Sequence, residues 1–407
     1  MNETVEVTVR TIFSLLAILS LVGVACAAPQ GAQPATPSEE TTQTQPSDQA
    51  AGGTLPEGPS ALRDQTSPEF PEPLVDPSQI ISGGPPPDGI PPIDEPAFVS
   101  ISQADQYLEP EAPVVVLEAG AEVRAYPVQI LTWHEIVNDT VGGKPVVVTY
   151  CPLCNTAVSF ERVVNGVETT FGTSGRLYNS ALVMYDRATE SLWTHFDGRA
   201  VVGLLAGEQL EPIPSPLLAW SELKSAHPEA QVLDREQTGA NRPYGSNPYA
   251  GYDNPEGFPF LFRGDVDARA QAMQRVVGVA LSGEATAYTL EAVSGGEARA
   301  TNGEVGGQPI VILWKSGQAS ALEENEVAEG RDVGSVGVFV PEADGRQLTF
   351  QTEAGQFVDQ ETGSTWNIAG QATEGPLAGR ALERIHHFDT FWFAWSSYQP
   401  GTALVEG

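Results

Sequence analysis

Residues 142–150 read Gly-Gly-Lys-Pro-Val-Val-Val-Thr-Tyr, and residues 306–314 read Gly-Gly-Gln-Pro-Ile-Val-Ile-Leu-Trp. In each stretch a glycine turn precedes a run of mostly β-branched and aromatic residues, a pattern typical of a strand that follows a tight turn. The two stretches match closely enough to indicate that one structural unit occurs twice in the chain.

Further matches flank this pair in the same order. They are Ala-Tyr at 125–126 and 287–288, Leu-Trp at 192–193 and Thr-Trp at 365–366, Leu-Ala-Gly at 205–207 and 377–379, and Ala-Trp at 219–220 and 394–395. The offset grows from 162 to 175 residues along the chain, as loop insertions in a duplicated unit would make it grow. We therefore predict an internal duplication into two similar lobes, 98–240 and 265–407, packed as a pseudo-dimer.

Short runs rich in Val, Ile, Thr and aromatics, separated by Gly, Asn and Pro, predict a mainly β fold of the β-rich α+β class. Asn165-Gly166 lies between two such runs and indicates a hairpin, because both residues tolerate the positive backbone dihedrals of a tight turn. We expect helical turns at 130–138 and 217–225, where the apolar spacing approaches 3.6 residues. Residues 241–264, rich in Pro, Tyr and Gly, are predicted to be an extended crossover that joins the lobes and lines a groove.

The first 26 residues resemble an export signal. An apolar run after Arg10 ends in small residues at Cys26, and it is shorter than a comfortable membrane span. Gly-Val-Ala-Cys at 23–26 resembles a bacterial lipoprotein signal, so we predict lipidation of Cys26, a membrane anchor and an extracytoplasmic location. Ordinary cleavage within Ala-Cys-Ala at 25–27, giving a secreted protein, is the alternative. Residues 27–97 have few large apolar side chains and are predicted to be a disordered linker.

The composition excludes several classes of protein. There are 20 Lys plus Arg against 53 Asp plus Glu, a net charge of −33, which repels nucleic-acid phosphates. The 41 Gly and 33 Pro are too many for a helical bundle or a coiled coil. Nucleic acid is therefore excluded as a partner, and a protein partner or a small anionic ligand stays open.

The two lobes differ in their cysteines. Cys151 and Cys154 follow the first repeat as Cys-Pro-Leu-Cys, whereas Lys-Ser-Gly-Gln follows the second. Residues required only by the fold should occur in both copies, so this pair is a candidate site. Two thiolates favour a soft ion, copper or zinc, and need further ligands. The candidates for completing the site are His195, His386 and His387.

The cysteine pair allows two other interpretations. Cys151 and Cys154 are redox candidates, because a strand that leads into Cys-Pro-x-Cys is similar to a thioredoxin corner; the following residues, however, favour a strand over that fold's long helix. A local structural disulfide is the other alternative, although so small a loop constrains the unfolded chain little.

A second block of the first lobe has no counterpart in the other. Residues 171–180, Phe-Gly-Thr-Ser-Gly-Arg-Leu-Tyr-Asn-Ser, combine small residues with fixed donors. Arg176, Asn179 and Arg187 are candidates for binding a carboxylate or a phosphate. A tight turn with a structural Arg-Asp pair is the competing interpretation.

The motifs together resemble the domain-of-unknown-function 3179 (DUF3179) family. The resemblance covers about residues 98–404 and lies in five stretches: 146–159, 171–180, 183–187, 191–193 and 391–395. It implies that the cysteine pair and the block 172–180 belong to the family signature, and it assigns no reaction.

These observations favour an exported, membrane-anchored protein whose Cys-x-x-Cys site binds copper or zinc or performs thiol redox chemistry. The alternative is a non-catalytic binding or surface-interaction module with a local disulfide. An enzyme acting on a small anionic ligand at Arg176 and Arg187 is a third hypothesis, and it requires a pocket that holds both side chains. Whether the protein is an enzyme is left open by the sequence.

Overall fold

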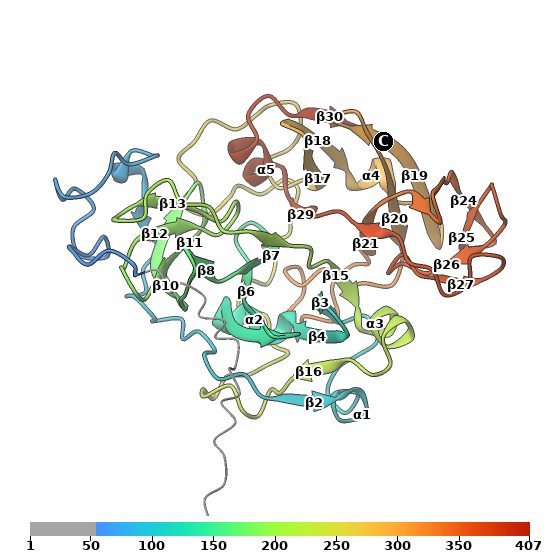
Figure 1. Ribbon diagram of the computed structural model, residues 1–407, viewed down its shortest axis with the longest axis horizontal. Helices are drawn as coiled ribbons and strands as arrows, with labels where there is room; N and C mark the ends of the chain where they lie inside the picture. The colour runs from blue at the N-terminus through green and yellow to red at the C-terminus, as the bar shows by residue number, and fades with distance from the viewer. Residues whose placement is uncertain (1–53) are drawn as a thin grey trace, which may run out of the picture. The chain divides into compact units, whose positions relative to one another are not determined.

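The computed structural model of the protein describes residues 54–407 (Figure 1). Strands supply most of the regular structure in this range, which confirms the predicted mainly β fold. The predicted signal segment with Cys26, and the linker as far as residue 53, lie outside the described residues. In the described part of the chain, helices are too short or too polar to cross a membrane.

The first half contains three sheets. One comprises, in spatial order, β15 (Leu217–Ala219), β3 (Pro113–Ala119), β4 (Glu122–Pro127), β16 (Gln231–Leu233) and β2 (Phe98–Ser100). The second sheet comprises, again in spatial order, β14 (Pro212–Ile213), β7 (Thr156–Glu161), β6 (Lys144–Cys151) and β5 (Ile136–Val141). The third comprises β1 (Ile81–Ser82), β10 (Phe171–Tyr178), β11 (Ala181–Asp186), β12 (Leu192–Thr194) and β13 (Arg199–Val202).

Short elements complete the first half. The hairpin predicted at Asn165-Gly166 is confirmed, with both residues at positive φ between β8 (Val163–Val164) and β9 (Val167–Glu168). The helices are α1 (Ile101–Ala104), α2 (Val128–His134) and α3 (Trp220–Ala226), and a 3-10 turn, η1, covers Pro77–Gln79.

The second half also contains three larger sheets. They comprise β29 (Phe388–Phe391), β17 (Arg275–Leu281), β18 (Glu284–Thr289) and β30 (Ala403–Val405); then β19 (Ala298–Val305), β20 (Gln308–Lys315), β21 (Ser335–Val340) and β28 (Glu383–Arg384); then β24 (Phe350–Glu353), β25 (Gln356–Asp359), β26 (Thr365–Trp366) and β27 (Ala372–Glu374). The remaining elements are the hairpin of β22 (Glu342–Ala343) and β23 (Arg346–Gln347), and helices α4 (Leu290–Val293) and α5 (Trp392–Tyr398).

The order of strand pairing is the same in the two halves. Each contains an antiparallel hairpin, β3–β4 or β17–β18, whose first strand also pairs with the strand just before the last helix of that half, α3 or α5. The final strand, β16 or β30, then runs parallel to the second strand of the hairpin. The two halves therefore reuse one arrangement of strands.

This arrangement corrects one pairing made from the sequence. Trp220 begins α3 and Trp392 begins α5, and their backbone N–H groups donate to the carbonyls of Ala112 and Gln274, each just before the initial hairpin. The counterpart of Trp220 is thus Trp392 and not Trp395. The sequence pairs Trp220 with a tryptophan three residues too far along the chain, because Ala-Trp also occurs at 394–395.

The helices predicted at 130–138 and 217–225 are only partly correct. The first stretch divides into α2 and β5, because the chain turns at Glu135, whose φ is 59°. β-Branched Ile136 and Val137 then enter a strand, which suits them better than a helix. In the second stretch, β15 precedes α3.

Among residues 54–407, the two largest hydrophobic clusters contain residues of both halves, whereas the two smaller clusters each lie within one half. One cluster packs Val114 and Leu218 of the first half with Val311 and Phe339 of the second. The largest cluster contains both Cys151 and residues 391–395. Neither half therefore buries its apolar surface alone.

The structure differs from the predicted linker over residues 54–97. Ala61, Ile80 and Ile93 of this segment are buried, and β1 adds a strand to the edge of β10. In Figure 1 the segment, in blue, follows the green strands β10 to β13. Backbone hydrogen bonds to strands β5 and β10, supplemented by few apolar anchors, order a stretch whose composition is typical of disorder.

The crossover lies against the cysteine-bearing turn. No helix or strand lies between Leu233 and Arg275, and the chain is held by isolated contacts. The backbone N–H of Asn247 donates to the Asn325 carbonyl at 2.8 Å, and the Tyr252 hydroxyl donates to the Leu153 carbonyl at 3.0 Å. Residues 241–264 thus bring aromatic side chains to the site.

Candidate metal centre

The cysteines lie at the tight connection between β6 and β7. Cys151 is the last residue of β6 and faces Thr156, the first of β7. The reversal is made possible by Asn155, at φ 53°, a conformation that Asn tolerates better than most residues. In the second half, residues 316–334 connect the equivalent strands, so a short thiol-bearing turn exists only in the first half.

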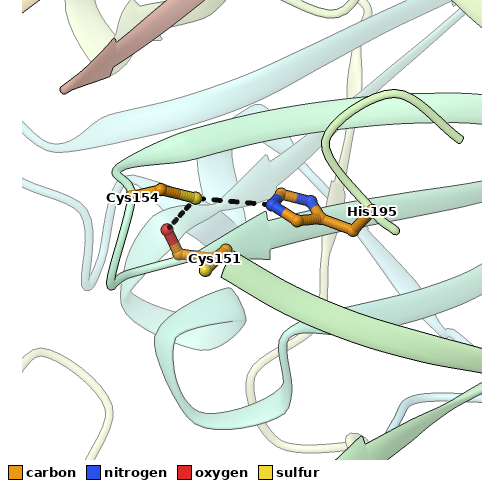
Figure 2. A group of neighbouring side chains, drawn as sticks. All are labelled: Cys151, Cys154 and His195. Carbon is orange, nitrogen blue, oxygen red and sulfur yellow. Dashed lines mark hydrogen bonds between the residues drawn. The ribbon is translucent and has the colours of Figure 1, made fainter. Parts of the chain in front are cut away.

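His195 completes a group of three buried donors. It follows β12 directly, and its Nε2 lies 3.4 Å from the Cys154 Sγ (Figure 2). The ligand atoms of Cys151, Cys154 and His195 all lie within 4.8 Å of one another. The three side chains are at most 1% exposed. The structure therefore brings together the cysteine pair and one of the three histidines that the sequence offered.

Both cysteines are free, so the local disulfide considered from the sequence is not formed. The Cys154 Sγ is directed toward His195 and toward the Cys151 carbonyl oxygen, at 3.8 Å (Figure 2). The two sulfur atoms are thus unbonded to each other and remain available as metal ligands.

Thr149 fixes the tautomer of His195. Its hydroxyl donates to the Val158 carbonyl at 2.7 Å, and the His195 Nδ1 lies 3.2 Å from the same hydroxyl oxygen. A hydroxyl has one proton to give, so toward His195 it accepts, and Nδ1 must carry the hydrogen. The lone pair of the neutral ring is therefore on Nε2, which faces the cysteines.

The two thiols differ in acidity. Burial raises the pKa of both thiols, but the hydrogen bond from Cys154 and the proximity of the His195 ring more than offset burial at Cys151, whose pKa lies well below its ordinary value. Burial, followed by the adjacent Cys151, raises the pKa of Cys154 well above the usual range. One sulfur of the pair thus carries a negative charge more readily than the other.

The second half holds the cysteine turn in place. The Cys154 carbonyl accepts from the Thr390 hydroxyl at 2.9 Å and from the Phe391 backbone N–H at 3.2 Å. The Thr156 hydroxyl donates to that of Thr390 at 2.7 Å. Strand β29 thus fixes the turn from the other side of the shared core.

A buried ionic network supports the residue after Cys154. The Asn155 amide oxygen accepts from Arg275 at 3.4 Å, and its amide nitrogen donates to Asp389 at 3.3 Å. Arg275 also pairs with Asp253 of the crossover at 2.9 Å. Three distant segments therefore converge beneath the thiols.

His386 and His387 lie outside the cysteine group. His386 packs edge-on against Phe388, and the His387 Nδ1 lies 3.2 Å from the Ile385 carbonyl. Burial lowers the pKa of each ring to about 4. Both rings are therefore neutral at physiological pH.

The predicted anion ligands are dispersed. Arg187 pairs with Asp94 at 2.7 Å and with Asp88 at 3.3 Å, so its charge is balanced within the protein. Asn179 adopts φ 49° in the turn between β10 and β11. Arg176 lines a cavity of about 450 Å³ that Arg187 does not line. Within the described residues, one cavity thus does not hold both arginines.

Two residues of the site were missed from the sequence. Thr149 stands two positions before Cys151 in a strand, where nothing distinguishes it from other strand threonines. Glu135 lines the cavity and is 7% exposed. A single acidic residue after an apolar stretch was the available signal, but assigning residues 130–138 to a helix obscured it.

The fold and the cluster define a class: mainly β proteins of two similarly paired halves, with a buried Cys-Cys-His group in the first. The chain belongs to the family described as "Protein of unknown function (DUF3179)", whose model matches residues 87–402. This membership confirms the resemblance found in the sequence. Neither the curated proteins nor the solved structures contain a match to the chain.

Proposed function

We propose that the protein binds one copper(I) or zinc(II) ion through Cys151, Cys154 and His195. The observation that carries the proposal is the convergence of two sulfur atoms and one imidazole nitrogen, all buried, within 4.8 Å. Soft thiolates and a neutral imidazole are the donors that these ions prefer.

The spacing suits a metal ion. With bonds of about 2.3 Å to sulfur and 2.0 Å to nitrogen, a tetrahedral ion separates a sulfur from a nitrogen ligand by about 3.5 Å. The distance from the Cys154 Sγ to the His195 Nε2 is 3.4 Å. The Thr149 hydroxyl, accepting from Nδ1–H, supplies the outer hydrogen bond that ligating histidines usually make.

Three protein ligands leave one position of a tetrahedral zinc ion to another ligand, whereas copper(I) can be bound by three ligands alone.

Thiol redox exchange is the second candidate function, favoured by the two free thiols of unequal acidity. Exchange with a partner protein requires an accessible sulfur, and these sulfurs belong to residues no more than 1% exposed. Burial therefore supports metal binding over redox exchange.

The test is to purify the full-length protein and measure bound metals by mass spectrometry together with free thiols. We expect about one copper or zinc ion per chain, lost in Cys151→Ser, Cys154→Ser and His195→Gln. His386→Gln and His387→Gln are matched controls that should keep the ion. Metal-free wild type that cannot be loaded with either ion, or equal metal content in all variants, would contradict the proposal.

We propose in addition that the chain is exported and anchored through a lipidated Cys26. Support comes from the sequence of the first 26 residues alone. Mass spectrometry of the mature N-terminus tests it: a diacylated or triacylated Cys26 is expected, and Cys26→Ser should release the protein from membranes. An unmodified N-terminus would contradict lipidation.

We also infer that the two halves arose by internal duplication and pack as a pseudo-dimer. The repeated order of strand pairing supports this. So does a side-chain motif: Asp186 and Asp359 each accept from a Thr, a Ser backbone N–H and a Trp indole at the same spacing. On this interpretation the metal centre was gained or retained in one copy only.

A further inference from the structure

A cavity adjoins the turn that carries both cysteines. Its volume is about 450 Å³, within the range of small-molecule pockets. The walls are mostly apolar: Ile90, Leu177 and Leu182 line the cavity, together with Leu153, which stands between the two cysteines. Such walls suit a ligand with a hydrophobic body better than a hydrated ion.

The crossover supplies an aromatic wall, which consists of Tyr249, Tyr252 and Phe260. The Tyr252 hydroxyl donates to the Leu153 carbonyl at 3.0 Å and accepts from the Phe260 backbone N–H at 3.1 Å, and these contacts fix the ring of Tyr252 in place. The Tyr249 and Tyr252 rings meet edge to face, with their centroids 6.5 Å apart. Because aromatic rings attract cations as well as apolar groups, this wall suits an organic cation.

Glu135 presents an unused carboxyl group, and it is the one acidic residue of the cavity lining. Its backbone groups are already paired: the N–H donates to the Leu131 carbonyl at 2.6 Å, and the carbonyl accepts from the Tyr150 N–H at 2.9 Å. The residue is more than nine-tenths buried, and its carboxyl group makes no hydrogen bond or ion pair with the residues that the structure describes. A buried carboxyl group without a partner is costly, and a ligand that pairs with it removes that cost.

The charges around Glu135 favour a cation as that ligand. Arg176 is the one basic residue of the lining, but its guanidinium faces the Leu62 carbonyl, at 3.0 Å, and the Gln65 side-chain amide, at 2.9 Å, neither of which lines the cavity. Cys151 is close enough to Glu135 for a charge on its sulfur to raise the pKa of the carboxyl group, after the larger effect of burial. In a chain of net charge −33, this end of the cavity therefore attracts positive charge.

The lining distinguishes an organic cation from a metal ion. Magnesium and calcium ions require about six or more oxygen ligands, largely from carboxylates and water, whereas the cavity offers one carboxyl group between apolar walls. A primary ammonium group needs fewer partners, since a single carboxylate can accept more than one of its N–H groups. Its charge also favours the ionised form of the carboxyl group with which it pairs.

We propose that this cavity binds a small primary amine with an apolar body, whose ammonium group pairs with the Glu135 carboxylate and whose body packs against the aromatic wall. The site goes beyond the proposed metal binding and does not depend on it. The charged end of the ligand lies on the side of Cys151, and the apolar body extends toward Phe260, which is half-exposed.

The test measures, by calorimetry, the binding to the full-length protein of three probes that share a phenylethyl body: 2-phenylethylamine, 2-phenylethanol and 3-phenylpropionate. The amine should bind about tenfold more tightly than the alcohol, and the carboxylate should bind most weakly, because only the ammonium group forms a charge-assisted bond with Glu135. Glu135→Gln should weaken the amine about tenfold or more and leave the alcohol nearly unchanged. An amine that binds wild type no more tightly than the alcohol would overturn the proposal.

Further variants separate this site from net charge, from unfolding and from the metal centre. Glu229→Gln removes the same charge at an exposed position outside the cavity and should change nothing. Ala250→Trp places a large ring at an exposed position of the lining and should weaken both the amine and the alcohol, so it supplies the test if Glu135→Gln does not fold. Cys154→Ser should retain amine binding even where it loses metal; loss of the amine there would assign it to the metal centre instead. Amine binding insensitive to both cavity substitutions would contradict the proposal.

Discussion

His195 is useful to the centre only because another side chain orients it. An imidazole can present either nitrogen, and rotation of the ring or a change of tautomer would turn a proton toward the sulfurs. The Thr149 hydroxyl prevents this by committing its own proton to Val158. A residue that would make no bond to the proposed ion thus decides which nitrogen faces the cysteines.

Thr149→Val tests this role. The substitution keeps the shape of the side chain and removes the hydroxyl, so affinity for the proposed ion should fall about 10- to 100-fold. The measurement is competition with a chelator of known affinity. Thr132→Val is the matched control, because the buried Thr132 hydroxyl also bonds a backbone carbonyl, at 2.7 Å, outside the centre. Equal losses in the two variants would show that only packing was disturbed.

His387 makes stability depend on pH. Burial lowers its pKa to about 4 in the folded protein, from an ordinary value of 6.5. The unfolded chain therefore takes up a proton first as the pH falls, and stability present above pH 6.5 is lost progressively down to about pH 4. Urea unfolding at a series of pH values should give a shallower decline for His387→Asn, which can keep the hydrogen bond to Ile385.

The surface substitution Glu229→Gln should leave that decline as it is in the wild type. A wild-type slope retained in His387→Asn would mean that other groups carry the pH dependence.

At the scale of the element, the same turn is built twice. Between β11 and β12, Asp186 accepts from the Thr189 backbone at 2.6 Å and from the Trp193 indole at 3.0 Å. Between β25 and β26, Asp359 accepts from the Thr362 backbone at 2.6 Å and from the Trp366 indole at 3.0 Å. In each half, one buried carboxylate thus accepts hydrogen bonds from the backbone and side-chain donors of the turn.

Asp186→Ala and Asp359→Ala should destabilise the protein by similar amounts, about 3–5 kcal/mol each, because several buried donors lose their acceptor at once. Equilibrium unfolding in urea measures both. The comparison is Asp344→Asn, which removes an exposed ion pair with Arg380, suits the positive φ of 52° at this position, and should cost less than about 1 kcal/mol. A cost below that at either buried aspartate would refute the prediction.

The elements also show what could be read from the sequence. Alternating β-branched runs predicted the strands, and Asn165-Gly166 predicted its hairpin, because these signals act over neighbouring residues. The approach of His195 to Cys154 depends on how separate strands assemble, which spacing does not encode. Residues 54–97 were misjudged because their order comes from pairing with β5 and β10 and not from their own composition.

For the whole molecule, residues 54–97 belong to the folded unit. Limited digestion with a nonspecific protease, followed by mass spectrometry, should leave residues 54–97 within the resistant fragment. Burial of Ala61, Ile80 and Ile93 and the bonds of this segment to β5 and β10 would keep it from the protease. A resistant fragment that begins near residue 98 would restore the linker interpretation.

The hold of β29 on the cysteine turn has a consequence for the order of assembly. Ribosomes make the chain from its N-terminus, so Cys151, Cys154 and His195 exist 195 residues before Thr390 is added. Until Thr390 and Phe391 bind the Cys154 carbonyl, the cysteine turn lacks these two hydrogen bonds. An ion that arrived during synthesis would therefore meet a less constrained turn than an ion that arrived after β29 had joined the fold.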